Sequence, residues 1–153
     1  MVDFGRGIKA GIISGIIYGI ITALLAAIMA SIFSDIFADF SGAGIVVEGV
    51  AVVAIVFVGA IIIGIISGII GGIIFGLIYA AVYNSLPGST SVMKGIVLSI
   101  IFWIIFSIVF GYGTLTMNME LYVINNVIIG IISALIWGFL LGKFWDKFSP
   151  KKA

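Results

Sequence analysis

The stretch from Ala60 to Ala80 has a small residue at every fourth position, mostly isoleucine between, and no charge. In a water-exposed helix each interior glycine costs about 1 kcal/mol relative to alanine. In lipid the backbone has no solvent partner, so a helix is enforced despite the glycines. The four-residue spacing puts the small residues on one face, where a second helix can approach closely. The stretch therefore predicts a membrane helix whose small-residue face packs closely against another helix.

Composition places the whole chain in the membrane. Of its 153 residues, 63% are hydrophobic and 8% are charged, whereas a soluble domain carries about 25% charged residues. Several apolar runs exceed the roughly 20 residues that cross a bilayer. The fold class expected is therefore an all-α integral membrane protein, a four-transmembrane-helix bundle forming a single domain over residues 1–153.

The residue types available exclude much of catalysis. The chain has no cysteine and no histidine, which removes thiolate and imidazole metal sites and the usual nucleophile chemistry. Away from their ends the predicted spans contain no Asp, Glu, Lys or Arg, and hydrolysis needs an acid, a base or a metal. We expect a protein that is not an enzyme, with no catalytic residue, no cofactor, no metal and no nucleic-acid partner.

Hydropathy predicts four spans, at about 8–30, 50–82, 92–110 and 121–143. The second apolar run is about 51 Å long as a helix, so we expect it to cross at about 56–82 and to extend over 49–55 against protein. Residues 31–44 predict a short amphipathic helix at the interface. Turns are expected near 83–91, with Ser91 capping the third span, and at 111–120.

Charge predicts the orientation. The seven basic residues lie at one level, and four of the six acids, including Glu48 and Glu120, lie at the other. The positive-inside rule then puts both termini in the cytoplasm of a multi-pass plasma-membrane protein. Arg6 and Lys9 before the first span also fit a signal peptide; the second half carries a counterpart of that span that cannot be one.

The two halves resemble each other, as about 6–87 and 91–150. The sequence Gly64-Ile-Ile-Ser67 recurs as Gly130-Ile-Ile-Ser133. Each half would be a two-span hairpin, giving two tandem parallel repeats with glycine-zipper packing. The alternative is that any two spans rich in glycine and isoleucine align by composition alone. The expected helix-packing residues are Gly11, Gly15, Gly19, Gly64, Gly68, Gly72, Gly76, Gly130, Ala134 and Gly138.

The order of several features resembles a known group of small membrane proteins. Gly72-x-x-x-Gly76-Leu-Ile-Tyr79 leads to Leu86-Pro87-Gly88, and Lys94-Gly95 then opens a span that bears Trp103. This pattern, over about residues 60–145, resembles the four-span prokaryotic proteins of the YagU-like and related domain-of-unknown-function families. Those families carry a histidine that this chain lacks. The resemblance implies a fold and a membrane location, and no activity.

A few polar residues could contact a ligand. An amide of Asn125 or Asn126 could bond across to Ser67 or Thr22, either as interhelical glue or as a contact for a polar ligand or ion. Glu48 and Glu120 could form an acidic ring at the outer face of an oligomer, or could be solvated charges at helix N-termini.

These observations favour a structural or accessory membrane protein that packs with itself or with a larger complex, in contact with the bilayer. Rows of small residues on at least three spans suggest this, because they offer more groove than one small bundle needs. The alternative is an oligomeric transporter or channel for a small solute, favoured by the duplication and by Asn125 and Asn126. Lipid binding beside the glycine rows is a third possibility.

Overall fold

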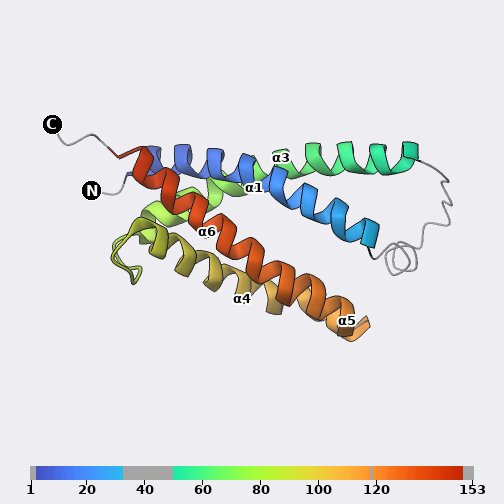
Figure 1. The fold of residues 1–153 in the computed structure, drawn as a ribbon. Coiled ribbons are helices and arrows are strands. Elements are labelled where there is room, and N and C mark those ends of the chain that lie inside the picture. The colour runs from blue at the N-terminus through green and yellow to red at the C-terminus, as the bar shows by residue number, and fades with distance from the viewer. Residues whose placement is uncertain (1–2, 33–49, 118, 150–153) are drawn as a thin grey trace.

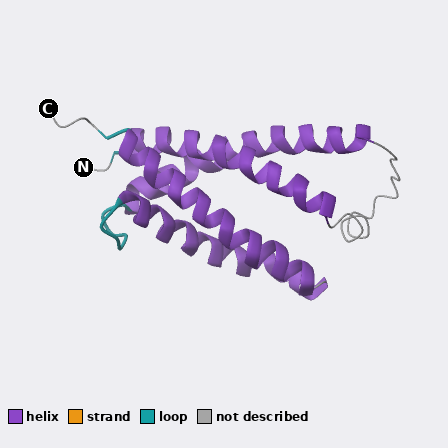
Figure 2. Cartoon of the chain, in the orientation of Figure 1, coloured by secondary structure: helices purple, strands orange, loops and turns teal. Residues whose placement is uncertain are grey.

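The computed structural model describes residues 3–32, 50–117 and 119–149, and every regular element in these ranges is helical (Figure 2). The elements are α1 (Phe4–Ile32), α3 (Val50–Val82), α4 (Ser91–Met117), α5 (Met119–Tyr122), the π-helix η1 (Val123–Ile129) and α6 (Gly130–Lys147). Four stretches are long and apolar enough to cross a membrane: Phe4–Leu25, Ile61–Val82, Ser91–Val109 and Asn126–Lys147. The predicted all-α chain with four spanning helices is confirmed.

The helices form two antiparallel hairpins. Helix α1 packs along α3, α4 packs along α6, and contacts between α1 and α6 join the two pairs. Figure 1 shows the hairpins meeting where the chain termini lie and separating towards their far ends. The start of α1, the end of α3, the start of α4 and the end of α6 therefore gather at one end of the molecule.

The buried core lies at this same end. Tyr79 and Leu141 are almost fully buried, and Trp145 is 3% exposed. Long isoleucine and phenylalanine side chains lie instead on the outside, as Ile63, exposed at 69%, illustrates. This inversion of the soluble pattern suits a bundle whose surroundings are as apolar as its interior.

One turn predicted from the sequence is not observed. The stretch 111–120 was expected to be a turn, and this is wrong, because α4 continues through Gly111 and Gly113 to Met117. The stretch contains no proline, and a continued helix satisfies the backbone groups that a turn would leave open. Beyond Ile32, the predicted amphipathic helix and Glu48 lie outside the described residues.

Candidate functional site

The glycines of α1 and α3 face each other in antiparallel order. The opposed pairs are Gly7 with Gly76, Gly11 with Gly72, Gly15 with Gly68, and Gly19 with Gly64. A Cβ built on Gly15 would lie 2.7 Å from the carbonyl carbon of Gly68, and one built on Gly68 would lie 2.8 Å from that of Gly15. Any side chain would therefore overlap the backbone opposite. The Cα hydrogens point at carbonyl oxygens instead, a weak hydrogen bond found at close helix interfaces.

Helices α4 and α6 repeat this arrangement with fewer glycines. Gly138 faces Gly95, whose carbonyl oxygen would lie 2.7 Å from a Cβ built on Gly138. Gly142 faces Ser91 in the same way. In both hairpins the opposed positions step by four along each helix in opposite directions. Ala134, from the same predicted row, is 6% exposed.

One opposed pair in the second hairpin contains a large side chain. Gly130 faces the indole of Trp103, whose Nε1 donates to the backbone carbonyl of Asn126 at 2.7 Å. This carbonyl belongs to η1, the π-helical turn before α6. The glycine at 130 thus leaves room for an indole rather than for another backbone.

The polar residues predicted to bond between helices bond locally. The Thr22 hydroxyl donates to the carbonyl oxygens of Tyr18 and Gly19, and the Ser67 hydroxyl donates to that of Gly64. The predicted bond from an asparagine to Thr22 or Ser67 is therefore not made by these two hydroxyl protons. The side chains of Asn125 and Glu120 lie outside those described.

Arg6 ties the start of the chain to its last helix. Its Nε donates to the backbone carbonyl of Trp145 at 2.6 Å, and its guanidinium also bonds the Ser149 hydroxyl. The guanidinium carbon lies 4.2 Å from the centre of the Trp145 ring, and one nitrogen lies 3.8 Å from the Asp146 carboxylate. The Asp3 carboxylate caps α1 by accepting from the Arg6 backbone N–H at 2.9 Å.

Ser91 joins three helices beside Arg6. Its hydroxyl lies 2.5 Å from the Asp146 carboxylate, to which it donates, and 2.6 Å from the Tyr83 hydroxyl. Its backbone carbonyl accepts from the Tyr79 hydroxyl at 2.5 Å. The predicted cap at Ser91 is wrong: the Thr90 hydroxyl accepts the Met93 N–H, which leaves the Ser91 side chain for these contacts.

Lys94 completes this group by donating to the Tyr83 carbonyl at 2.9 Å with its ammonium 4.2 Å from the centre of the Tyr83 ring. We name the group the terminal clasp. Its members come from all four spanning helices, the turn after α3 and the segment after α6: Arg6, Tyr79, Tyr83, Ser91, Lys94, Trp145, Asp146 and Ser149. Arg6 donates to the Trp145 carbonyl and bonds the Ser149 hydroxyl, and Tyr79 donates to the Ser91 carbonyl, so the clasp fastens the two hairpins together. The Trp145 Nε1 atom is buried and has no hydrogen-bond partner among the described residues.

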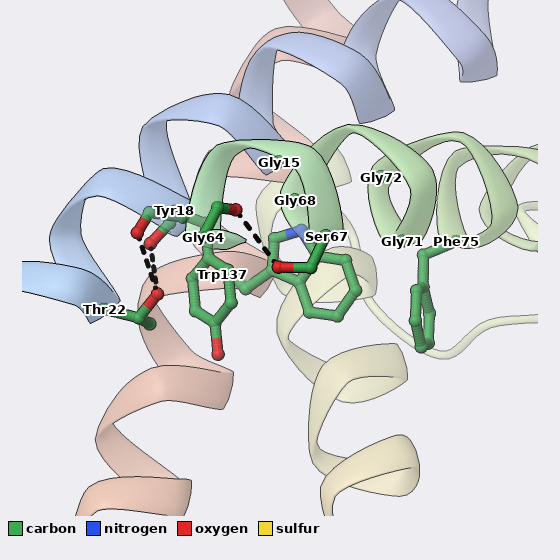
Figure 3. A pocket seen from close by; sticks show the side chains of 11 residues that line it. Gly15, Tyr18, Thr22, Gly64, Ser67, Gly68, Gly71, Gly72, Phe75 and Trp137 are labelled. Carbon is green, nitrogen blue, oxygen red and sulfur yellow. Dashed lines mark hydrogen bonds between the residues drawn. The ribbon is translucent and has the colours of Figure 1, made fainter. Parts of the chain in front are cut away.

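A pocket of about 190 Å³ lies where the hairpins begin to separate (Figure 3). We name it the mid-span pocket. Its lining comes from glycines, hydroxyl residues and one phenylalanine of α1 and α3 and from one residue of α6: Gly15, Tyr18, Gly19, Thr22, Gly64, Ser67, Gly68, Gly71, Gly72, Phe75 and Trp137. The glycine rows that bring α1 and α3 together therefore also form part of its wall.

Aromatic rings close one side of the mid-span pocket. The Trp137 ring stacks on Tyr18 at 5.3 Å between ring centres and meets Phe75 edge-on at 4.3 Å. The Trp137 Nε1 atom is buried and has no hydrogen-bond partner among the described residues. In Figure 3 the indole lies beside Tyr18 and Ser67, with its nitrogen towards the turns that carry Gly15 and Gly68.

Sequence reasoning missed both the clasp and the pocket. Arg6 was interpreted as a topology or signal-peptide residue and Lys94 as a topology residue and part of the family pattern. Neither Asp146 nor Trp137 was singled out. A polar or aromatic residue at the same end of each of four spans was the available signal for the clasp. In the described part of the chain, no three His, Cys, Asp or Glu residues lie where they could hold a metal ion. The arrangement can fasten helices and accommodate an apolar group.

Comparison with protein families identifies a family to which the chain is similar over its whole length. The model of a family of unknown function, DUF6789, matches residues 1–153. Searches of curated proteins and of solved structures found no match. The resemblance to YagU-like proteins stays a prediction.

Proposed function

The chain belongs to the DUF6789 family of unknown function, and we propose that it is a non-enzymatic structural or accessory helix bundle that packs with a second copy of itself or with a larger membrane complex. The apolar length of α3 carries this proposal. The four membrane-compatible helices support the coarser statement that it is a multi-pass membrane protein.

Helix α3 has more apolar length than a bilayer can cover. Its 33 residues include no charged side chain, and at 1.5 Å per residue they span about 50 Å, against a hydrocarbon core of about 30 Å. Even at a tilt of 40°, about 26 residues would fill the core. The start of α3 then extends past the lipid as apolar helix, and a protein neighbour would cover it.

We also propose that both termini lie in the cytoplasm of a plasma-membrane protein. Arg6, Lys94, Lys143 and Lys147 all lie near the helix ends that gather at the terminal clasp. Basic residues favour the cytoplasmic side of a membrane. Cysteine substitutions at Ser89 and at Met119, which is 62% exposed at the end away from the clasp, labelled with an impermeant reagent in whole cells, would test this: Met119→Cys should react and Ser89→Cys should not.

The hairpins are proposed to be duplicated units held by glycine zippers. Gly11 opposes Gly72 in the first hairpin as Gly95 opposes Gly138 in the second. Because these glycine rows pack helices of the same chain against each other, they are not available as a surface for a partner. The partner surface is proposed instead to be the start of α3.

Native mass spectrometry of protein extracted gently from its own membrane tests the association. We expect a fixed oligomer or a complex with other subunits, and a strict monomer with no partner after cross-linking would overturn the proposal. Val58 is 54% exposed near the start of the span, so Val58→Lys should reduce association. Exposed Ala81, near the other end of α3, provides the matched control, and Ala81→Lys should leave association unchanged.

A second candidate function is an oligomeric transporter or channel for a small solute. The mid-span pocket favours it, because a cavity lined by three helices lies at the depth where transporters bind their substrates. Flux in liposomes above that of empty vesicles, over a panel of ions and small neutral solutes, would support transport. Flux equal to that of empty vesicles would rule against it.

A further inference from the structure

We propose that the mid-span pocket holds the end of a phospholipid acyl chain, which enters from the leaflet on the side away from the terminal clasp. The occupant is hydrocarbon from the bilayer itself rather than a polar solute. Occupancy of the pocket does not depend on whether the bundle associates with a partner, so it is separate from the function proposed above.

The depth of the pocket matches the end of a lipid chain. Gly15 lies in the middle of the span Phe4–Leu25, Gly71 in the middle of Ile61–Val82, and Trp137 in the middle of Asn126–Lys147. The centre of each span corresponds to the centre of the bilayer, where acyl chains end. A headgroup does not reach this depth.

The chemistry of the wall favours hydrocarbon. The hydroxyls of Thr22 and Ser67 donate to carbonyls of their own helices, so both protons are already used. The rest of the wall is glycine backbone and the rings of Tyr18, Phe75 and Trp137. The Tyr18 hydroxyl is hydrogen-bonded to Ser133, and the Trp137 indole N–H, which has no partner among the described residues, supplies one polar contact. A buried water needs two to four polar partners, whereas apolar cavities of about 150 Å³ stay dry and take up apolar molecules. At about 190 Å³ the pocket exceeds that size.

The shape of the fold sets the direction of entry. The terminal clasp fastens the hairpins at one end, where the Arg6 Nε of the first hairpin donates to the Trp145 carbonyl of the second at 2.6 Å. Towards the other end the hairpins separate (Figure 1). The pocket runs from Phe75 on the clasp side to Thr22 and Gly64 on the far side. A chain descending from the far leaflet would therefore meet the open end first.

Gly71 allows the pocket to be filled without disturbing the helix pair. A Cβ built there has no other atom within 4 Å, in contrast to its neighbour Gly72. Gly71→Leu places a side chain in the pocket and improves helix propensity. Gly59, also on α3, is equally open but lies outside the lining, so Gly59→Leu is the matched control.

The test uses the full chain with ¹⁵N-labelled tryptophan in phosphatidylcholine nanodiscs containing lipid spin-labelled at the acyl-chain end. The label broadens the indole N–H signal of any tryptophan it approaches. We expect strong broadening of Trp137 in the wild type and in Gly59→Leu, and a several-fold smaller effect in Gly71→Leu. Lipid labelled near its headgroup should broaden Trp137 much less. Trp145, in the buried core, is the reference for folding.

Equal broadening of Trp137 in the wild type and Gly71→Leu would overturn the proposal, as would broadening in the wild type no greater than that of Trp103. If Gly71→Leu shifts the Trp145 signal, the substitution has disturbed the fold, and a second variant is needed to test occupancy of the pocket. Ser67 lines the pocket and has an exposed side chain, so Ser67→Leu should reduce the broadening from the pocket mouth. Unchanged broadening in a folded Ser67→Leu protein would overturn the proposal too.

Discussion

Trp103 donates its indole N–H to the carbonyl of Asn126 at 2.7 Å, and in doing so it replaces a backbone donor. In an α-helix the Asn126 carbonyl would accept from the N–H of Gly130, four residues on. Here Gly130 donates to the Val127 carbonyl instead. A π-helical turn leaves such a carbonyl free, and the indole of the neighbouring helix satisfies it. The local widening of the helix and the large side chain opposite it therefore belong together.

Replacing Trp103 with phenylalanine should lower the free energy of unfolding by about 1 kcal/mol beyond the loss of ring volume. The change keeps an aromatic ring but removes the N–H, and a carbonyl left without a partner costs about 1–3 kcal/mol when buried, less where bilayer surroundings offer alternatives. Unfolding by SDS in mixed micelles measures this difference.

Trp137→Phe is the control for that experiment. It removes the same atoms from a ring whose Nε1 has no partner among the described residues. If the two variants are destabilised equally, the bond to Asn126 contributes nothing measurable.

Alanine substitutions at Gly68 and Gly71, one helical turn apart on α3, should have opposite effects on stability. At Gly68 a methyl group would lie 2.8 Å from the Gly15 carbonyl carbon, and overpacking of this kind costs about 1–3 kcal/mol. At Gly71 the methyl meets open space, so the helix should gain up to about 1 kcal/mol. Thermal unfolding in one detergent compares the pair. Similar melting temperatures would mean that the glycine row does not hold α1 against α3.

Removing the guanidinium of Arg6 should loosen the two hairpins from each other. Arg6→Met keeps much of the apolar stem but loses the bonds to the Trp145 carbonyl and the Ser149 hydroxyl. Hydrogen bonds made by charged groups contribute about 1.5–3 kcal/mol, so we expect a loss in that range by SDS unfolding. Lys9 is exposed on the same helix, and Lys9→Met should change stability by less than about 0.5 kcal/mol.

Tyr79→Phe should be costlier than Tyr83→Phe. Tyr79 is fully buried, and its hydroxyl is 2.5 Å from the Ser91 carbonyl. Without the Tyr79 hydroxyl, the Ser91 carbonyl loses its donor at a site that water does not reach. We expect this to lower the free energy of unfolding by about 1–3 kcal/mol. The part-buried Tyr83 hydroxyl contacts the Ser91 hydroxyl instead, so solvent can replace it. Amide hydrogen exchange at the start of α4 should rise more in Tyr79→Phe, and the reverse order would contradict this assignment.

The spanning helices could be predicted because length and hydropathy determine them almost alone. The run from Val50 to Val82 is uniformly apolar and ends before Pro87 and Gly88, and α3 has the expected bounds. Gly88 has a φ of +132°, a backbone conformation that glycine adopts without a steric cost. The turn expected at 111–120 failed because glycine is a weak helix breaker when lipid or protein surrounds the backbone.

The sites could not be predicted because they depend on which helix ends meet. The Ser91 hydroxyl can cap a helix in many sequences, and only the approach of Asp146 directs it elsewhere. The π-helical turn has no local signature, since it depends on Trp103, 23 residues earlier in the chain. The mid-span pocket arises from the separation of two hairpins, a property of no single segment.

The Arg6 contacts also determine the order in which parts of the structure can form during synthesis. Arg6 and Trp145 are 139 residues apart in the chain, so Arg6 leaves the ribosome long before the residues that bind it exist. The first hairpin must therefore enter the membrane before the Arg6 guanidinium has its hydrogen-bond partners. Its partner carbonyl and hydroxyl arrive only with the end of α6, and the bonds of Arg6 close last. The two hairpins can therefore be joined by Arg6 only after the second hairpin has been synthesised and inserted.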